Sequence, residues 1–143
     1  MRKLFLLLIL SFMAQHLIAG EDRGPPLEHL VQGNYFLIGK VLDSKETYSG
    51  EVSIQKDDSG LIVKRIIAGR LTRGKAAIEY ATPDKIPVLR MRFSDGGVAH
   101  EATCMVGSDL DNFARLTCHL YTPNKKTMEP GMEALFINFN KPW

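Results

Sequence analysis

The fold of this chain is decided by residues 88–106, which have the sequence VLRMRFSDGGVAHEATCMV. In its first half, Leu89, Met91 and Phe93 alternate with two arginines. Successive side chains of a β-strand point to opposite faces, so this alternation predicts a strand with one apolar and one charged face. The Asp-Gly-Gly sequence at 95–97 supplies residues that tolerate a positive φ, as tight hairpin turns require. The stretch therefore predicts two antiparallel strands.

The same pattern extends over most of the chain and predicts an all-β protein. Short runs rich in Val, Ile, Leu, Phe and Tyr are separated by clusters of Gly, Pro, Asp and Asn, with no convincing helix among them. The expected strands are 34–42, 48–56, 61–67, 75–80, 88–94, 98–106, 114–121 and 132–139. Because turn residues join consecutive runs, we expect a single antiparallel up-and-down β-barrel of about eight strands. A two-sheet sandwich would show the same periodicity.

Two of the expected connections, 81–87 and 122–131, are long and contain two prolines each. Proline lacks the amide donor that a central ladder needs, so these segments are predicted to be loops. Loops on a rigid scaffold often carry binding residues. We expect these two to be the functional loops.

The first twenty residues are predicted to be a secretory signal peptide, which makes the mature protein secreted or periplasmic. Arg2 and Lys3 form a basic start before the apolar run 4–13, and small residues at 19 and 20 offer a cleavage point. A membrane anchor is the alternative, but the run is shorter than the roughly 20 residues of a spanning helix. The expected division of the chain is a signal peptide at 1–20, a leader at 21–33 with one helical turn near 27–31, and a barrel domain at 34–143.

The charge balance argues against a nucleic-acid partner. The 143 residues include 18 Lys and Arg and 16 Asp and Glu, and removal of residues 1–20 takes away two basic residues and no acidic one. A near-neutral mature chain is not built to attract polyanions or anionic membranes. The outward parity is also too charged to face lipid in an outer-membrane barrel. We expect no membrane span in the mature chain.

The two cysteines predict a disulfide between neighbouring strands. A hairpin that turns near Asp111 would place Cys104 opposite Cys118, and both belong to the apolar parity of their strands. Two cysteines of an exported protein usually form a disulfide. A redox site would need a closely spaced pair, and a zinc site would need four ligands at short spacings, neither of which is present.

Sequence motifs of catalysis are missing. There is no Gly-x-Ser-x-Gly elbow, His-Glu-x-x-His, phosphate-binding glycine loop or calcium loop. The acidic residues Glu79, Glu101 and Asp111 are scattered, and the first two lie on outward parities. We therefore expect a non-enzymatic protein with no catalytic residues, no cofactor and no metal.

Two polar residues could carry a ligand site in the barrel interior: His100 has an inward parity, whereas the run that contains Arg65 is apolar on both parities and leaves its direction open. His100 shares its parity with Ala102 and Cys104, where it is either a ligand-binding residue or a residue of the core or barrel mouth. Arg65 either points inward beside it as a cationic anchor or, as the simpler interpretation, reaches solvent with Lys64 near a strand end.

The opening hairpins resemble the calycin-type barrels, the lipocalin and avidin-like group. The residues that carry this resemblance are Gly33, Tyr35, Gly39, Tyr48, Gly50, Val52, Ile54, Gly60 and Val63. Tyr35 and Phe36 stand where true lipocalins have a tryptophan, and no helix precedes the last strand, so no ligand is carried over. The chain is also loosely similar to exported bacterial lysozyme inhibitors, small disulfide-bearing barrels that act through loops.

The sequence is compatible with two functions. The first is binding of a small apolar or amphipathic ligand in the barrel interior. Its expected contacts are Tyr35, Tyr48, Arg65, Leu89, Met91, Phe93 and His100. The same side chains could instead simply fill an eight-stranded interior. The second function is recognition of a secreted protein, for example inhibition of a secreted enzyme, through loops 81–87 and 122–131.

Overall fold

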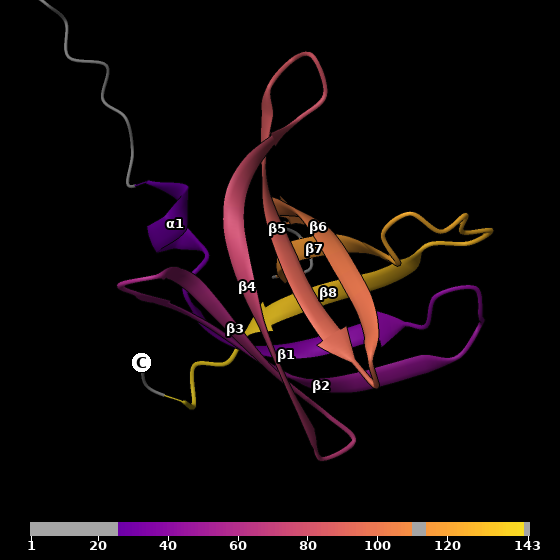
Figure 1. Ribbon diagram of the computed structural model, residues 1–143. Helices are drawn as coiled ribbons and strands as arrows, with labels where there is room; N and C mark the ends of the chain where they lie inside the picture. Colours follow the sequence, from indigo (N-terminus) through magenta and orange to yellow (C-terminus); the bar gives the residue numbers. More distant parts are fainter. Residues whose placement is uncertain (1–25, 110–113, 142–143) are drawn as a thin grey trace, which may run out of the picture.

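The computed structural model describes residues 26–109 and 114–141, which form a closed antiparallel β-barrel (Figure 1). The predicted signal peptide lies outside the described residues. The elements are α1 (Leu27–Leu30), β1 (Gly33–Lys40), β2 (Thr47–Asp57), β3 (Gly60–Ile67), β4 (Arg70–Ala81), β5 (Ile86–Asp95), β6 (Val98–Asp109), β7 (Ala114–Tyr121) and β8 (Gly131–Ile137). The predicted eight-stranded barrel is confirmed. In the described part of the chain, no helix has the length and apolar character of a membrane span.

Each strand pairs with the next one along the chain, and β8 pairs with β1. This last pairing closes the barrel and excludes the two-sheet sandwich. Hairpin connections alternate between the two ends of such a barrel. The connections 41–46, 68–69, 96–97 and 122–130 surround one end, which we call the mouth, whereas 58–59 and 82–85 lie at the end near α1 (Figure 1).

The predicted alternation of side chains is confirmed. In β5, Leu89 and Met91 are fully buried, whereas Arg92 is exposed. The turn after β5 has the expected chemistry, since Gly96 and Gly97 adopt positive φ values of 56° and 79°. The buried apolar side chains form one cluster, consisting of Val31, Tyr35, Leu37, Val52, Ile54, Leu61, Val63, Leu89, Met91, Phe93, Ala102, Cys104, Leu116, Cys118, Leu120 and Leu135. The middle of the barrel is therefore filled, as expected for a barrel of this strand number.

The prediction was wrong about the fourth strand and the connection after it. β4 begins at Arg70 rather than at residue 75, and the connection to β5 contains only residues 82–85. Pro87 pairs with Tyr80 inside the ladder. It is the second residue of β5, and a missing amide donor is tolerated near a strand start. The second predicted loop is present as the nine residues 122–130.

The end of the predicted leader belongs to the barrel rather than to a separate segment. The expected helical turn forms as α1, and the residue after it, Val31, is fully buried. The Tyr35 hydroxyl donates a hydrogen bond of 2.8 Å to the Val31 carbonyl. Burial raises the pKa of Tyr35 to about 12, although the charge of Arg115 opposes the shift. Val31 and Tyr35 thus close the barrel at the α1 end.

The predicted disulfide is present. Cys104 of β6 and Cys118 of β7 are direct partners in the ladder, and their sulfur atoms lie 2.07 Å apart. Both side chains are buried in the barrel interior. The bond therefore joins two neighbouring strands from the inside.

Gly39 is required for the packing of an aromatic ring. It lies opposite Tyr48 in the β1–β2 ladder, and an added Cβ would overlap the Tyr48 ring. We expect Gly39→Ala to lower the free energy of unfolding by about 1–3 kcal/mol, because the ring must leave its place. Urea unfolding of this variant measures the loss. The exposed substitution Ser49→Ala is the control and should change stability by less than about 0.5 kcal/mol. Equal effects of the two substitutions would contradict this role of Gly39.

Candidate functional site

A buried ion pair lies just inside the mouth. Arg65 of β3 is only 2% exposed, and its guanidinium donates two hydrogen bonds to the carboxylate of Glu133 on β8. One of these bonds, from Nη1 to Oε2, measures 2.9 Å. The Tyr48 hydroxyl of β2 donates a further hydrogen bond to Oε1 of Glu133. These three side chains form a polar network, which we call the floor network. Arg65 and Glu133 are buried, and Tyr48 is half-buried.

The simpler interpretation of Arg65, that it reaches solvent, is wrong. Val63 and Arg65 share the inward parity of β3, and the fully buried Val63 fixes that face inside, so that Lys64 points to solvent instead. Glu133 was not among the site residues predicted from the sequence. Its signal was available, since Glu133 has the same parity as the buried Leu135.

Two members of the floor network, Arg65 and Tyr48, have raised pKa values. Burial alone would lower the pKa of Arg65, but the hydrogen bonds and charge of Glu133 outweigh it and raise the pKa. Burial and the negative charge of Glu133 raise the pKa of the Tyr48 hydroxyl. Tyr48 therefore remains a hydrogen-bond donor and Arg65 remains a cation at neutral pH.

Two rings continue the network toward the mouth. The guanidinium carbon of Arg65 lies 4.1 Å from the centre of the Phe93 ring, within the range of a cation–π contact. The Phe93 ring stacks on His100, with centres 5.6 Å apart and planes 28° apart. Burial lowers the pKa of His100, so the imidazole is neutral at pH 7. Among the described residues, neither Nδ1 of His100 nor Nε of Arg65 has a hydrogen-bond partner.

Above these groups is a pocket of about 360 Å³ that opens at the mouth. Its lining consists of Val41, Leu42, Tyr48, Arg65, Ile67, Arg70, Thr72, Phe93, Asp95, His100 and Leu120. Most of the walls are apolar. The rim carries an exposed ion pair of 2.6 Å between Arg70 and Asp95. We call this space the mouth pocket.

The structure brings four of the seven predicted contact residues together. Tyr48, Arg65, Phe93 and His100 all line the mouth pocket. The other three predicted contacts, Tyr35, Leu89 and Met91, are buried elsewhere in the core. Tyr35 lies at the α1 end, where it is bonded to Val31. Side-chain parity separates inside from outside, but it carries no information on depth along the barrel axis.

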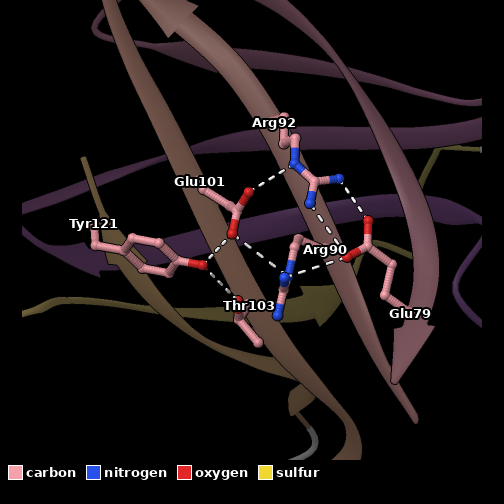
Figure 2. A network of polar contacts seen from close by, with 6 residues as sticks. All are labelled: Glu79, Arg90, Arg92, Glu101, Thr103 and Tyr121. Carbon is pink, nitrogen blue, oxygen red and sulfur yellow. Dashed lines mark hydrogen bonds and ion pairs between the residues drawn. The ribbon is translucent and has the colours of Figure 1, made fainter. Parts of the chain in front are cut away.

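A second polar cluster lies on the outer surface, across four strands (Figure 2). The cluster contains Glu79 of β4, Arg90 and Arg92 of β5, Glu101 and Thr103 of β6, and Tyr121 of β7. Arg92 contacts both carboxylates at 2.6 Å, and Arg90 contacts the same two at 3.2 and 3.5 Å. The Tyr121 hydroxyl donates to Glu101.

The outer cluster neutralises its own charges. The hydrogen bond from Arg92 lowers the pKa of Glu79, so this carboxylate is held ionised between cations. Glu79 and Glu101, which are scattered in the sequence, thus each link the same two arginines. No group of three or more metal-ligating side chains occurs in the ranges that the structure describes.

Comparison with known proteins adds no relative. No family model matches this chain, and no curated protein matches it either. The class of the protein is therefore defined by its architecture, a closed eight-stranded up-and-down β-barrel with an internal disulfide and a buried ion pair below an open pocket.

Proposed function

We propose that this protein binds a small, uncharged amphipathic molecule in the mouth pocket and does not transform it. One observation carries the proposal: an apolar pocket at the open end is lined by His100 and Arg65, whose buried Nδ1 and Nε atoms lack partners among the described residues. The proposed ligand site therefore lies at the mouth, and not in the middle of the barrel, which is filled by side chains.

The size and lining of the mouth pocket support a small ligand. Its volume of about 360 Å³ falls at the lower end of the range of small-molecule sites, which are typically apolar with a few convergent polar groups. Leu42, Ile67 and Leu120 offer apolar contacts for the body of the ligand. The neutral His100 can accept or donate a hydrogen bond to its polar group.

The charges around the pocket favour an uncharged ligand. The positive charge of Arg65 is balanced by Glu133, and that of Arg70 is balanced by Asp95. A charged ligand would have to lose water without gaining an unpaired counter-charge, which is costly. The floor network also holds Arg65 in place before binding, which reduces the entropy lost on association.

Export of the protein forms part of the proposal. The disulfide between the chain's two cysteines supports an oxidising compartment, because such bonds rarely persist in the cytosol. The loop-based alternative lacks a comparable observation, since the connections 82–85 and 122–130 lie at opposite ends of the barrel.

Native mass spectrometry of the protein purified from its own host tests the proposal directly. We expect a bound small mass that is released on unfolding. The neutral fluorescent probe N-phenyl-1-naphthylamine should bind in the absence of the natural ligand and compete with it. A protein that carries no small mass and does not bind the neutral probe would contradict the proposal.

Substitutions locate the probe. Leu42→Asp places a charge on the apolar wall of the mouth pocket and should weaken probe binding at least about tenfold, since each 1.4 kcal/mol is a factor of ten. Ile38→Asp makes the same kind of change on the outer surface, where Ile38 is 57% exposed, and should leave the affinity unchanged. Equal loss in both variants would place the probe outside the mouth.

A further inference from the structure

A groove of about 330 Å³ runs along the outside of the barrel, separate from the mouth pocket. One wall comes from the segment after β8, where the Lys141 ammonium pairs with Glu51 of β2. The floor includes Ser53 of β2, and the other wall comes from the outward side chains of β3 and β4. The side chains of this outer groove that matter below are Ser53, Lys64, Ile66, Leu71, Arg73 and Lys141.

Unbalanced positive charge lies along the outer groove. Lys64 of β3 and Arg73 of β4 are direct partners in the β3–β4 ladder. Two residues further along β4, Lys75 is the direct partner of Arg92 in the β4–β5 ladder. Like charges directly opposite each other destabilise a sheet. Glu79 and Glu101 neutralise Arg92. No ion pair involves Lys64 or Arg73, which both line the groove, so these two cations have no carboxylate of a described residue within 4 Å.

An apolar pair lies beside these cations. Ile66 and Leu71 are also direct partners in the β3–β4 ladder, on the row next to Lys64 and Arg73. They are 43% and 44% exposed. The outer groove thus combines cations with two exposed apolar side chains in a concave space.

We propose that the outer groove binds an acidic segment of a partner polypeptide in which apolar side chains accompany the carboxylates. Carboxylates of the segment would pair with Lys64 and Arg73 and relieve their mutual repulsion. Its apolar side chains would cover Ile66 and Leu71. A segment of this kind matches both the charge and the apolar surface of the groove.

Two other anionic partners fit the outer groove less well. A membrane surface is flat on the scale of this protein and does not enter a concave groove. A purely charged polyanion leaves Ile66 and Leu71 uncovered. The near-neutral charge of the chain beyond residue 20 also argues against a general attraction to polyanions, because the excess of cations is local.

Fluorescence anisotropy with a labelled synthetic peptide of alternating Glu and Leu tests the proposal on the purified barrel. We expect saturable binding that weakens as salt is added, because the groove cations are exposed. The double variant Lys64→Ser/Arg73→Ser should bind at least about tenfold more weakly. Ile66→Ser/Leu71→Ser should weaken binding as well. The matched control Lys125→Ser/Lys126→Ser removes two exposed lysines from the β7–β8 connection and should bind like the wild type.

The folding of the key variant can be checked independently. Removal of the opposed Lys64 and Arg73 takes away a repulsion, so the thermal midpoint should stay the same or rise. Weaker binding in this variant therefore reports on the groove and not on unfolding.

Three outcomes would overturn the proposal. The first is an equal loss of binding in the Lys125/Lys126 control. The second is equally tight binding of a polyglutamate peptide, which would indicate a site for any polyanion. The third is tight binding to phosphatidylglycerol vesicles that the Glu-Leu peptide does not displace, which would indicate a membrane surface.

Discussion

Replacing Glu133 with glutamine is expected to lower the free energy of unfolding by about 3–5 kcal/mol, the usual cost of breaking a buried ion pair. Both side chains of the pair are almost inaccessible, with 2% exposure for Arg65 and 0% for Glu133. The Glu133→Gln variant keeps the shape of the side chain but leaves Arg65 as a buried cation without a counter-charge. Chemical denaturation followed by circular dichroism measures the loss.

The exposed pair between Lys56 and Glu28 provides the matched control. Its nitrogen and oxygen lie 2.6 Å apart, but both side chains are more than 40% exposed. Glu28→Gln should therefore change the free energy of unfolding far less than Glu133→Gln does. Equal losses of stability in the two variants would contradict a tightly coupled floor network.

Removal of the whole floor network separates its stability effect from its role in binding. The triple variant Tyr48→Phe/Arg65→Met/Glu133→Leu replaces every polar member with an apolar side chain. Its stability should recover much of the loss seen in Glu133→Gln, because no unpaired polar group then remains buried. The triple variant also lacks the Arg65 side chain that the floor network holds beside the mouth pocket. Although its stability recovers, it should therefore bind the neutral probe more weakly than the wild type.

Loss of the disulfide is the second change with a large expected effect. The bridge joins residues separated by 14 positions, and a closed loop of this size contributes about 3 kcal/mol on the chain-entropy estimate. Cys104→Ala/Cys118→Ala should lower the free energy of unfolding by at least this amount. The two alanines also leave a small gap in the core, which adds to the loss.

Reduction of the wild-type protein isolates the contribution of the bond itself. Fully reduced wild type should lose about 3 kcal/mol without any gap in the core. The double alanine variant should not respond to the reductant. A wild type whose thiols titrate as reduced, yet whose unfolding midpoint is unchanged, would show that the bond does not stabilise the barrel.

Local alternation of apolar and polar side chains made the fold predictable from the sequence. In β5 and β7 every second side chain is apolar, so the inward face could be assigned without knowledge of the fold. The same parity placed Cys104 opposite Cys118, because one turn between two strands sets their register. Pro87 was predicted to lie in a loop because proline lacks an amide donor. The missing donor is tolerated near the start of a strand, so the position of a proline decides whether it interrupts a ladder.

The candidate sites depend on contacts between residues that are distant in sequence. Arg65 and Glu133 are 68 residues apart, and β3, which is apolar on both faces, gave no direction for the arginine. The outer groove likewise needs β2, β3, β4 and the segment after β8 to lie side by side. No local pattern reports such neighbours.

The amino-acid order alone determined the number of strands, the inward faces of the strands with clear alternation, the hairpin pairing and the cysteine bridge, because each follows from side chains within one hairpin. Closure of β8 onto β1 was decided only by the tertiary structure. That closure brings Glu133 to Arg65 and separates a filled middle from an open mouth. The physical reason is that parity assigns a face to each side chain, whereas depth and partners along the barrel depend on how all eight strands are staggered around it.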